Sequence, residues 1–471
     1  MSNQPNDIGM IGLGVMGRNL VLNMADHGFS VAGYDRDAEQ VKLMLDDAAG
    51  QRISATNSIH EFLSTLRQPQ SIMLLVPAGK PVDAVIEDLH PLLQPGDLII
   101  DAGNSHFRDT DRRAKDLSSK GLHFMGVGIS GGEHGARFGP SIMPGGPADA
   151  YDRVRTLFEA IAAKVGDEPC VAYLGPGSAG HFVKMVHNGI EYGIMELIAE
   201  AYDIMKRGLG MNDDALHDVF ATWNAGELDA FLMEITAEIL VKEDDRTPGR
   251  LVDFIKDAAR QKGTGRWTAQ DAMDLTVPIP TIDTAVSMRE MSSLKQERLL
   301  ASKHFGEGAQ RIREDLRTFL KRLRNAVWFA VATTYAQGMA LLRSASAEYH
   351  YHVPLAEVAA LWRGGCIIRS GMLENIRNAY RKRPSLQNLM LDPFFSDNLA
   401  AREGDLRSVV QSAVTAALPI PAFMASLSYF DAYRSAWLPA NLLQAQRDFF
   451  GAHTYERIDE KGTFHTQWTE D

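Results

Sequence analysis

The N-terminal part of the chain alternates short apolar runs with amphipathic stretches from Asp7 to about residue 178. This pattern is typical of parallel β-strands joined by crossover helices. The spacing of the runs predicts a doubly wound α/β domain. The predicted strands are Ile8 to Ile11, Val31 to Tyr34, Ile72 to Val76, Leu98 to Asp101, His123 to Val127 and Cys170 to Leu174.

The pattern changes after Gly177. No proline occurs from Ala179 to Thr247 or from Thr281 to Val353, and Leu, Ala, Met, Glu and Arg recur there at helical spacing. The last segment is polar and aromatic, which predicts an arm more than a core element. The sequence therefore predicts an α/β domain at residues 1–178, an all-helical domain at 179–440 and a C-terminal tail at 441–471.

Composition narrows the class of protein. Among 471 residues, 48 Lys and Arg face 60 Asp and Glu, a net charge of -12 that argues against broad nucleic-acid binding. No apolar stretch approaches the roughly 18 residues of a membrane span, and the first ten residues lack a signal-peptide pattern. We expect a soluble, cytoplasmic protein that contacts no membrane. Its two distant cysteines, Cys170 and Cys366, are expected to be buried thiols in a reducing compartment.

A glycine-rich loop directly follows the first predicted strand. Gly12, Gly14 and Gly17 form Gly-x-Gly-x-x-Gly, and Arg18 to His27 then has the pattern of a helix. The first glycine permits a tight turn, the second lets backbone N–H groups approach a pyrophosphate, and the third allows close packing of helix on strand. A lone glycine triplet is often only a turn, but this context predicts a dinucleotide-binding, Rossmann-like domain.

The end of the second strand bears on the choice of dinucleotide. Asp35 follows Gly12 by 23 residues and can accept hydrogen bonds from an adenosine ribose 2′-hydroxyl. A 2′-phosphate there would meet the carboxylates of both Asp35 and Asp37, which favours NAD. Arg36 argues for NADP, because its guanidinium can pair with a 2′-phosphate, although it can also stack on adenine.

Polar residues share one face of a predicted helix just after the α/β domain. Lys184, His187, Asn188 and Glu191 fall at i, i+3, i+4 and i+7, while Val183, Val186, Ile190, Ile194 and Leu197 form a neighbouring apolar arc. A solvated charge face is the common explanation of such a pattern. Two poor helix formers, His187 and Asn188, lie between the charges at a domain junction, which indicates a site for acid and base catalysis.

Other segments carry candidate ligands for an anion. The segment Gly126 to Arg137 is too glycine-rich for regular structure, and either close approach to a ligand or a hinge would explain it. Asn104 closes a strand, where ligand contacts cluster in α/β sheets. Four basic residues lie in unusual surroundings, but spacing cannot show that they converge: Lys262, Arg289, Arg447 and His453. The histidines show no metal-ligand spacing, so we expect no metal.

Several long motifs resemble those of the 6-phosphogluconate dehydrogenase family, the decarboxylating enzymes of the pentose phosphate pathway. The resemblance runs nearly end to end. It rests on IGLGVMGRN at Ile11 to Asn19, GISGGEHGARFGPSIMPGG at Gly128 to Gly146, HFVKMVHNGIEY at His181 to Tyr192, QKGTGRWT at Gln261 to Thr268, WRGGCIIRS at Trp362 to Ser370 and QRDFFGAHTY at Gln446 to Tyr455. It implies a homodimer in which the tail of one subunit crosses into the other's active site.

The resemblance also implies residue roles in oxidative decarboxylation of 6-phosphogluconate. Lys184 would be the general base and Glu191 the general acid. The sugar acid would contact Asn104, Ser130, Gly131, Gly132, His187 and Asn188. The phosphate would contact Tyr192, Lys262, Arg289 and, from the other subunit, Arg447 and His453. The dinucleotide would contact Gly12, Leu13, Gly14, Val15, Met16, Gly17, Asp35, Arg36, Asp37, Val76, Pro77, Ala78 and Asn104.

Three departures from the family pattern concern the cofactor. NADP-using members typically carry Ala at the position of Gly14, Asn-Arg-Ser/Thr at Asp35 to Asp37, and Lys at the position of Pro77. Each change removes a group expected around NADP, so we expect NAD or dual use. Two alternatives stay open: a related 3-hydroxyacid dehydrogenase acting on an unphosphorylated substrate, and a dinucleotide-binding regulatory protein without turnover.

Overall fold

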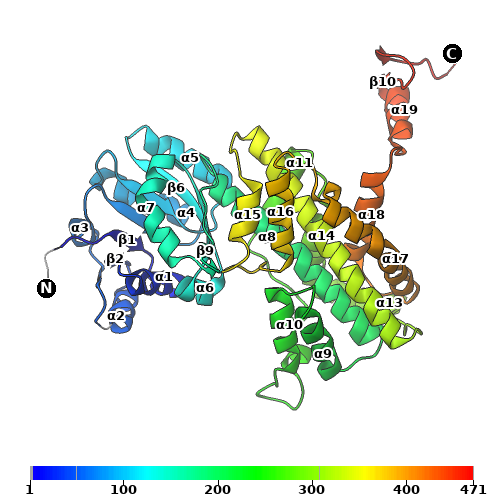
Figure 1. The fold of residues 1–471 in the computed structure, drawn as a ribbon, viewed down its shortest axis with the longest axis horizontal. Helices are drawn as coiled ribbons and strands as arrows, with labels where there is room; N and C mark the ends of the chain where they lie inside the picture. The colour runs from blue at the N-terminus through cyan, green and yellow to red at the C-terminus, as the bar shows by residue number, and fades with distance from the viewer. Residues whose placement is uncertain (1–3, 49, 307, 470–471) are drawn as a thin grey trace.

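The computed structural model describes residues 4–48, 50–306 and 308–469, which form an α/β domain, a helical domain and a projecting arm (Figure 1). The α/β domain contains a seven-stranded sheet of order β3-β2-β1-β4-β5-β6-β7. Strands β1 to β6 pair in parallel, and β7 is antiparallel to β6. The chain reverses its direction of travel across the sheet between β1 and β4, so a crevice opens at their carboxyl ends. The strands are β1 Ile8–Ile11, β2 Val31–Tyr34, β3 Ile53–Thr56, β4 Ser71–Leu74, β5 Leu98–Asp101, β6 His123–Ser130 and β7 Ser141–Gly145.

Two layers of helices cover this sheet. Apolar residues of α1, α2 and α7 pack on one face, and those of α3, α4 and α5 pack on the other. The fully buried parallel strands need apolar side chains on both faces, which explains their continuous apolar runs. The helices are α1 Val15–Asp26, α2 Ala38–Asp47, α3 Ile59–Ser64, α4 Lys80–Leu89, α5 Phe107–Ser118, α6 Gly132–Phe138 and α7 Ala148–Ile161, with one 3-10 turn, η1, at His90–Leu92.

One predicted strand is wrong. The segment Cys170 to Leu174 forms only an isolated bridge, between Val171 and Ile142 of β7. Ile142 N–H donates to the Cys170 carbonyl, but two residues later β7 carries Pro144, which has no N–H to continue a parallel ladder. The chain instead forms a small hairpin just before this segment, from β8 Lys164–Val165 and β9 Glu168–Pro169.

The helical domain is built around two long helices that pack together, α8 Ala179–Asp203 and α14 Leu316–Glu348. The prediction of a helical second half is confirmed, and α8 contains the predicted acid–base segment. α14 is buried over most of its length because apolar residues occur all round it. The remaining helices are α9 Asp213–Asn224, α10 Phe231–Val241, α11 Thr264–Asp274, α12 Pro280–Ser293, α13 Lys295–Phe305, α15 Leu355–Leu361, α16 Met372–Lys382, α17 Pro393–Thr415 and α18 Pro421–Arg434, with single turns η2 Ile204–Gly208, η3 Leu251–Phe254 and η4 Leu389–Leu391.

The chain ends in an arm that projects away from the helical domain (Figure 1). It contains α19 Ala440–Gly451 and an antiparallel pair, β10 Tyr455–Glu456 and β11 Thr463–Phe464. The arm and the segment before it expose many large apolar side chains, which is unusual for a surface that stays in water. These are Trp437, Leu438, Leu442, Leu443, Phe449, Phe450 and Ile458.

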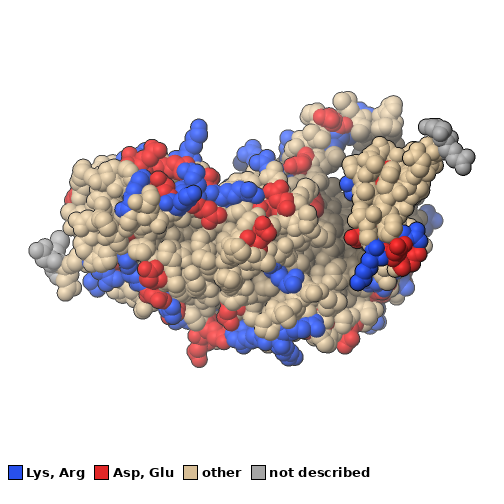
Figure 2. Space-filling model, turned by 90° about the horizontal axis from the view of Figure 1, so that it is seen from above, with Lys and Arg blue, Asp and Glu red and all other residues tan. Residues whose placement is uncertain are grey.

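The surface and the cysteines agree with the composition. Basic and acidic side chains lie next to one another on the face seen in Figure 2. None of the helices in the described part of the chain is long and apolar enough to cross a membrane. Cys170 and Cys366 are both free and buried, which confirms the expectation of buried thiols.

Candidate active site

The glycine loop between β1 and α1 has the geometry of a pyrophosphate site. Gly12 has φ +96, and a Cβ there would lie 2.5 Å from the Leu75 carbonyl oxygen. A Cβ on Gly17 would lie 1.9 Å from the Gly12 carbonyl oxygen, whereas Gly14 faces open space. Gly14 is the N-cap of α1 and supplies no side chain to cap it, so the first N–H groups of this helix are available to an anion. The residues present therefore fit a dinucleotide.

A cleft of about 800 Å³ joins this loop to the helical domain. Residues predicted from the sequence line it from both domains: Gly14, Val15, Met16, Gly17, Val76, Pro77, Ala78, Asn104, Asn188 and Lys262. Sequence reasoning missed others that line it, including His106, Asp109, Ile129, Thr264 and Trp267. Thr264 and Trp267 belong to the motif QKGTGRWT, so the motif marked the segment without showing which side chains face the cleft.

A smaller pocket of about 190 Å³ lies at the end of β2 and shares Val76 and Pro77 with the large cleft. Its lining includes Gly12, Asp35 and Arg36. Asp35 is the first residue after β2, and its carboxylate accepts from Leu13 N–H at 2.8 Å and Asp37 N–H at 3.0 Å. The Arg36 guanidinium forms an ion pair with Asp88 of α4. This partner lies 52 residues away and was not foreseen.

Asp37 has a structural role in this structure. It is the N-cap of α2, and its side chain accepts from the Glu39 N–H at 2.9 Å. A carboxylate at a helix N-terminus is stabilised by the N–H groups and by the helix dipole. The Asp37 carboxylate, which the sequence predicts to lie near the ribose 2′ position of the dinucleotide, thus also stabilises the start of α2.

The polar face of α8 is buried, and the solvated alternative is wrong. Lys184 is 6% exposed and His187 is fully buried, while Glu191 is partly exposed. Burial lowers the pKa of the Lys184 ammonium, and the nearby Glu191 carboxylate offsets this only in part. Burial raises the pKa of Glu191 against the opposing effect of Lys184 and Arg289. Both shifts favour a neutral amine beside a protonated carboxyl, a base and an acid on one helix face.

Neutral His187 connects this face to the end of β6. Burial holds its pKa well below the ordinary value. Its Nδ1 lies 3.0 Å from the Asn188 side-chain oxygen, which can only accept, so Nδ1 carries the proton. Nε2 is then the acceptor for the Ser130 hydroxyl at 3.4 Å. The Glu191 carboxylate is 3.9 Å from Nδ1, so these four side chains form one polar group.

The glycine-rich segment after Gly126 is regular, contrary to prediction. It forms the second half of β6 up to Ser130, and α6 begins at Gly132. The glycines are needed because α8 packs directly on this strand. A Cβ on Gly128 would lie 2.3 Å from the Cβ of Lys184, and one on Gly126 would lie 2.8 Å from the His181 ring. Close approach to the protein's own helix, as much as to a ligand, explains this composition.

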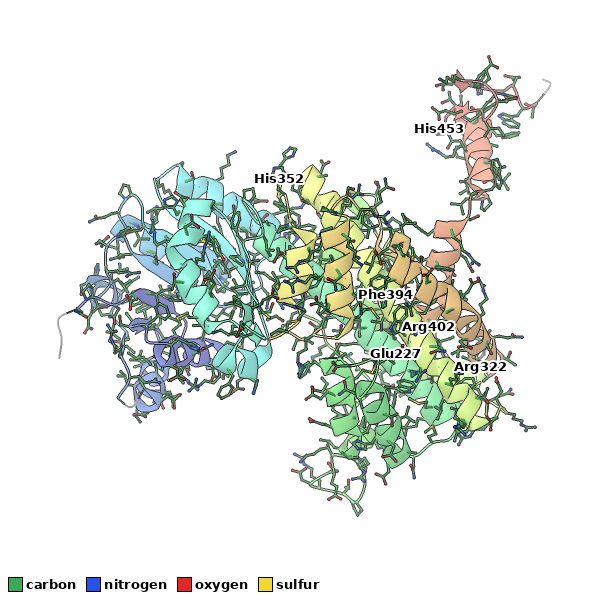
Figure 3. The ribbon with its side chains drawn as sticks, in the orientation of Figure 1. Glu227, Arg322, His352, Phe394, Arg402 and His453 are labelled. Atoms are coloured by element: carbon green, nitrogen blue, oxygen red, sulfur yellow. The ribbon has the colours of Figure 1, made fainter. Side chains whose placement is uncertain are left out.

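The predicted anion ligands divide into two groups. Arg289 of α12 stacks on the Tyr192 ring, with its guanidinium carbon 3.4 Å from the ring centre, and Lys262 lines the cleft. Gly131 follows β6 as the N-cap of α6 with φ +114, and Gly132 faces open space. Arg447 and His453 are exposed on the arm, which the structure does not bring to the cleft of the same chain (Figure 3).

In the described part of the chain, no group of three or more His, Cys, Asp or Glu side chains is arranged to hold a metal ion. A glycine-loop nucleotide fold, whose cleft is lined by Asn188 from the same helix face as a buried amine and a partly exposed carboxyl, defines a dinucleotide-dependent oxidoreductase with a separate helical domain.

Comparison with known proteins specifies the family. Residues 7–175 match the model of the NAD binding domain of 6-phosphogluconate dehydrogenase, and residues 180–468 match that of its C-terminal domain. The chain is 53% identical to "6-phosphogluconate dehydrogenase, decarboxylating" of Synechococcus elongatus, over 98% of each chain. It is 49% identical to the NADP(+)-dependent, decarboxylating enzyme of Bacillus subtilis, again over 98% of each.

A solved structure agrees with these matches. The 6-phosphogluconate dehydrogenase of Plasmodium falciparum superimposes with a TM-score of 0.95 at 44% identity, covering 98% of this chain and 100% of the other. That protein was described in its apo form and in complexes with its cofactor NADP+ and its substrate 6-phosphogluconate. The chain belongs to the 6-phosphogluconate dehydrogenase family.

Proposed function

We propose that this protein catalyses the oxidative decarboxylation of 6-phospho-D-gluconate to D-ribulose 5-phosphate and CO2, with reduction of NAD or NADP. The observation that carries the proposal is the buried Lys184 and the partly exposed Glu191 on one face of α8, the face from which Asn188 lines a cleft built for a dinucleotide. Family membership and about 50% identity to named decarboxylating enzymes over the whole chain support the same reaction.

Lys184 starts the reaction as a neutral amine. It removes the proton of the substrate C3 hydroxyl, which suits a group whose pKa burial has lowered. The bound nicotinamide supplies a hydride acceptor for the hydrogen on C3. The resulting 3-keto acid has its carbonyl β to the carboxylate, so this oxygen receives the electron pair when the bond to the carboxylate carbon breaks. Protonated Lys184 donates its proton to that oxygen, which lets CO2 leave without a metal.

Glu191 completes the reaction. Loss of CO2 leaves an enediol, and Glu191 donates a proton to the carbon that becomes C1 of the product. Lys184 accepts the enediol hydroxyl proton as the ketone forms at C2. Transfer of that proton from Lys184 to Glu191 restores both groups, which lie seven residues apart on the same face of α8.

Binding the substrate requires groups for a sugar acid and for a phosphate. We assign the hydroxyl and carboxylate contacts to Asn104, Ser130, Gly131, Gly132, His187 and Asn188. We assign the phosphate to Tyr192, Lys262, Arg289 and, from a second subunit, Arg447 and His453. Guanidinium and ammonium groups suit a phosphate dianion, and Arg289 is already oriented by its stacking on Tyr192.

We propose a homodimer with a shared active site and a cytoplasmic location. The arm extends away from its own chain, carries Arg447 and His453 and exposes a series of large apolar side chains (Figure 3). A second copy that covers the arm would bury this surface and bring both basic side chains to a phosphate subsite. The apolar character of the arm is therefore consistent with a permanent rather than a transient contact.

We further propose that NAD serves as well as, or better than, NADP. Asp35 and Asp37 place two carboxylates near the ribose of a bound dinucleotide. Arg36 is the cation that the sequence predicts for a 2′-phosphate, but it pairs with Asp88. A 2′-phosphate would have to displace Asp88 from Arg36 and would then remain close to three carboxylates.

The test of the proposed function is the initial rate of absorbance increase at 340 nm with 6-phosphogluconate, measured over a range of NAD and of NADP. We expect turnover with both or a preference for NAD in kcat/KM. A clear preference for NADP would contradict the cofactor proposal, and no turnover with either would contradict the reaction itself.

Asp88→Asn is expected to raise kcat/KM for NADP relative to NAD by about 1.4- to fivefold, because an exposed ion pair contributes about 0.2–1 kcal/mol. The substitution frees Arg36 for the 2′-phosphate. The matched control is Asp116→Asn, which removes the exposed ion pair between Asp116 of α5 and Lys120 just after that helix, and should leave the ratio unchanged. An unchanged or lower ratio in Asp88→Asn would show that Asp88 does not restrain Arg36.

A further inference from the structure

One carboxylate of the arm is completely buried, although its neighbours in sequence are exposed. Asp448 of α19 has no exposed surface, whereas Arg447 and Phe449 face solvent. Its Oδ1 accepts from Thr454 N–H and from His465 Nδ1, both at 2.9 Å. Its Oδ2 accepts from Thr466 N–H at 3.0 Å and from Trp468 Nε1 at 2.8 Å. This single side chain therefore connects the helix to the turn after it and to the end of the chain.

The four donors make burial of this charge favourable. Burial by itself would raise the pKa of Asp448, but the donors, led by His465, outweigh it and hold the pKa at about 2. All four hydrogen bonds to the Asp448 carboxylate therefore come from residues of the arm. Arg447 does not pair with it and instead donates to the Gln444 side chain at 3.1 Å, so its guanidinium stays exposed and is free to meet another anion.

The turn after α19 is strained on both sides of His453. Ala452 has φ 49 and Thr454 has φ 61, a left-handed conformation that residues with a side chain rarely adopt. Three hydrogen bonds hold this turn. Ala452 N–H donates to the Asp448 carbonyl at 2.9 Å, Thr454 N–H donates to the Asp448 carboxylate, and Gln444 donates to the Thr454 carbonyl at 2.6 Å. Strain of this kind persists only where surrounding contacts fix it, and it concentrates at functional sites.

We propose that Asp448 is a positioning residue, which fixes His453 and Arg447 in the arrangement that a phosphate subsite of a second copy receives. The inference rests on the proposed function, in which these two side chains bind the substrate phosphate in trans. Asp448 itself touches no substrate. Because its two oxygens are bound by four donors within the arm, it can set the geometry of the Arg447 and His453 side chains without pairing with either of them.

The first test is the kinetics of Asp448→Asn. An asparagine amide cannot accept from all four donors, so the turn should relax and the Arg447 and His453 side chains should lose their fixed positions. We expect KM for 6-phosphogluconate to rise at least tenfold, while the Kd of the dinucleotide, measured by fluorescence, stays unchanged. The matched control is Asp459→Asn, which removes an exposed carboxylate of the same arm that pairs only locally, with Arg457. That variant should keep the KM of the parent.

The second test is rescue in trans. Asp448→Asn chains keep an intact Lys184, and Lys184→Met chains keep an intact arm, so hybrids purified through two different tags should regain sites with the low parental KM. The pair Arg447→Ala and Lys184→Met tests the trans placement alone. Rescue of that pair without rescue by Asp448→Asn hybrids would overturn the role of Asp448. Failure of both pairs would instead contradict the shared active site.

Two further results would overturn the inference. A KM within twofold of the parent in Asp448→Asn would show that the arm positions Arg447 and His453 without this carboxylate. An Asp448→Asn protein that sediments as a monomer would show that Asp448 serves assembly, because loss of the partner, and not loss of geometry, would then explain the higher KM.

Discussion

Lys184→Met is expected to lower kcat for 6-phosphogluconate oxidation by about 10²- to 10⁴-fold, the usual contribution of a positioned general base. Methionine has a similar length and suits the buried surroundings of Lys184, so the helix should keep its packing. The side chain that accepts the C3 hydroxyl proton and later donates to the C3 oxygen would be gone. The measurement is the single-turnover rate of absorbance increase at 340 nm, together with the Kd of the dinucleotide, which should not change.

The control for this substitution lies at the next position of α8. Met185→Leu conserves volume at a side chain that is also buried, and it should leave kcat within about twofold of the parent. Near-normal turnover in Lys184→Met would remove Lys184 from the role of base. A loss of dinucleotide binding in both variants would indicate that α8 had shifted on the sheet.

Glu191→Gln is expected to slow formation of ribulose 5-phosphate by about 10²-fold or more, because an amide keeps the shape of the carboxyl but donates no proton to carbon. Reduction of the dinucleotide, which precedes this step, should be less affected. In deuterium oxide the parent should place one deuterium on a single face of C1, and the variant should lose this stereochemical preference. Proton NMR of the product distinguishes the two.

The control is Glu196→Gln, five residues further along the same helix. Burial also raises the pKa of Glu196, and Arg289 lies near it, but the mechanism assigns it no proton transfer. It should retain stereospecific labelling of C1. Unaltered product formation in Glu191→Gln would contradict the role of Glu191 as the acid.

The same pair of groups predicts the pH profile. Lys184 must be neutral and its pKa is lowered, so kcat/KM should rise with pH below the range of an ordinary lysine. Glu191 must be protonated in the last step and its pKa is raised, so kcat should fall with increasing pH above the range of an ordinary glutamate. In Glu191→Gln the fall on the alkaline side should disappear and the rise on the acidic side should remain.

Local sequence was sufficient where one physical cause decides the structure. Strands β1, β2 and β5 were predicted with their observed ends, because buried parallel strands require continuous apolar runs. The polar face of α8 was likewise visible from helical periodicity. The predicted strand Cys170 to Leu174 failed because Pro144, on another strand, ends the ladder. The composition of one segment gives no information about the strand that would pair with it.

The candidate site shows the same division. Gly12, Gly14 and Gly17 were recognised from spacing, but the pairing of Arg36 with Asp88 depends on how α4 packs beside β2. The cleft contacts of Trp267 and His106 depend on the approach of the helical domain to the sheet. Which side chains from distant segments converge depends on how the elements pack. From the sequence, only the family resemblance indicated any of these contacts.

The contact between α8 and the sheet has a consequence for how this enzyme can evolve. A Cβ on Gly180 would lie 2.2 Å from the Met143 carbonyl oxygen, and one on Gly128 would meet Lys184 itself. Backbone atoms cannot move aside as the end of a flexible side chain can, so even alanine would displace the helix. In a library of all single substitutions, these glycines should therefore be as intolerant as the proposed base, although they are assigned no part in the chemistry. Natural selection has more freedom to change what the cleft binds than to change the backbone that supports it.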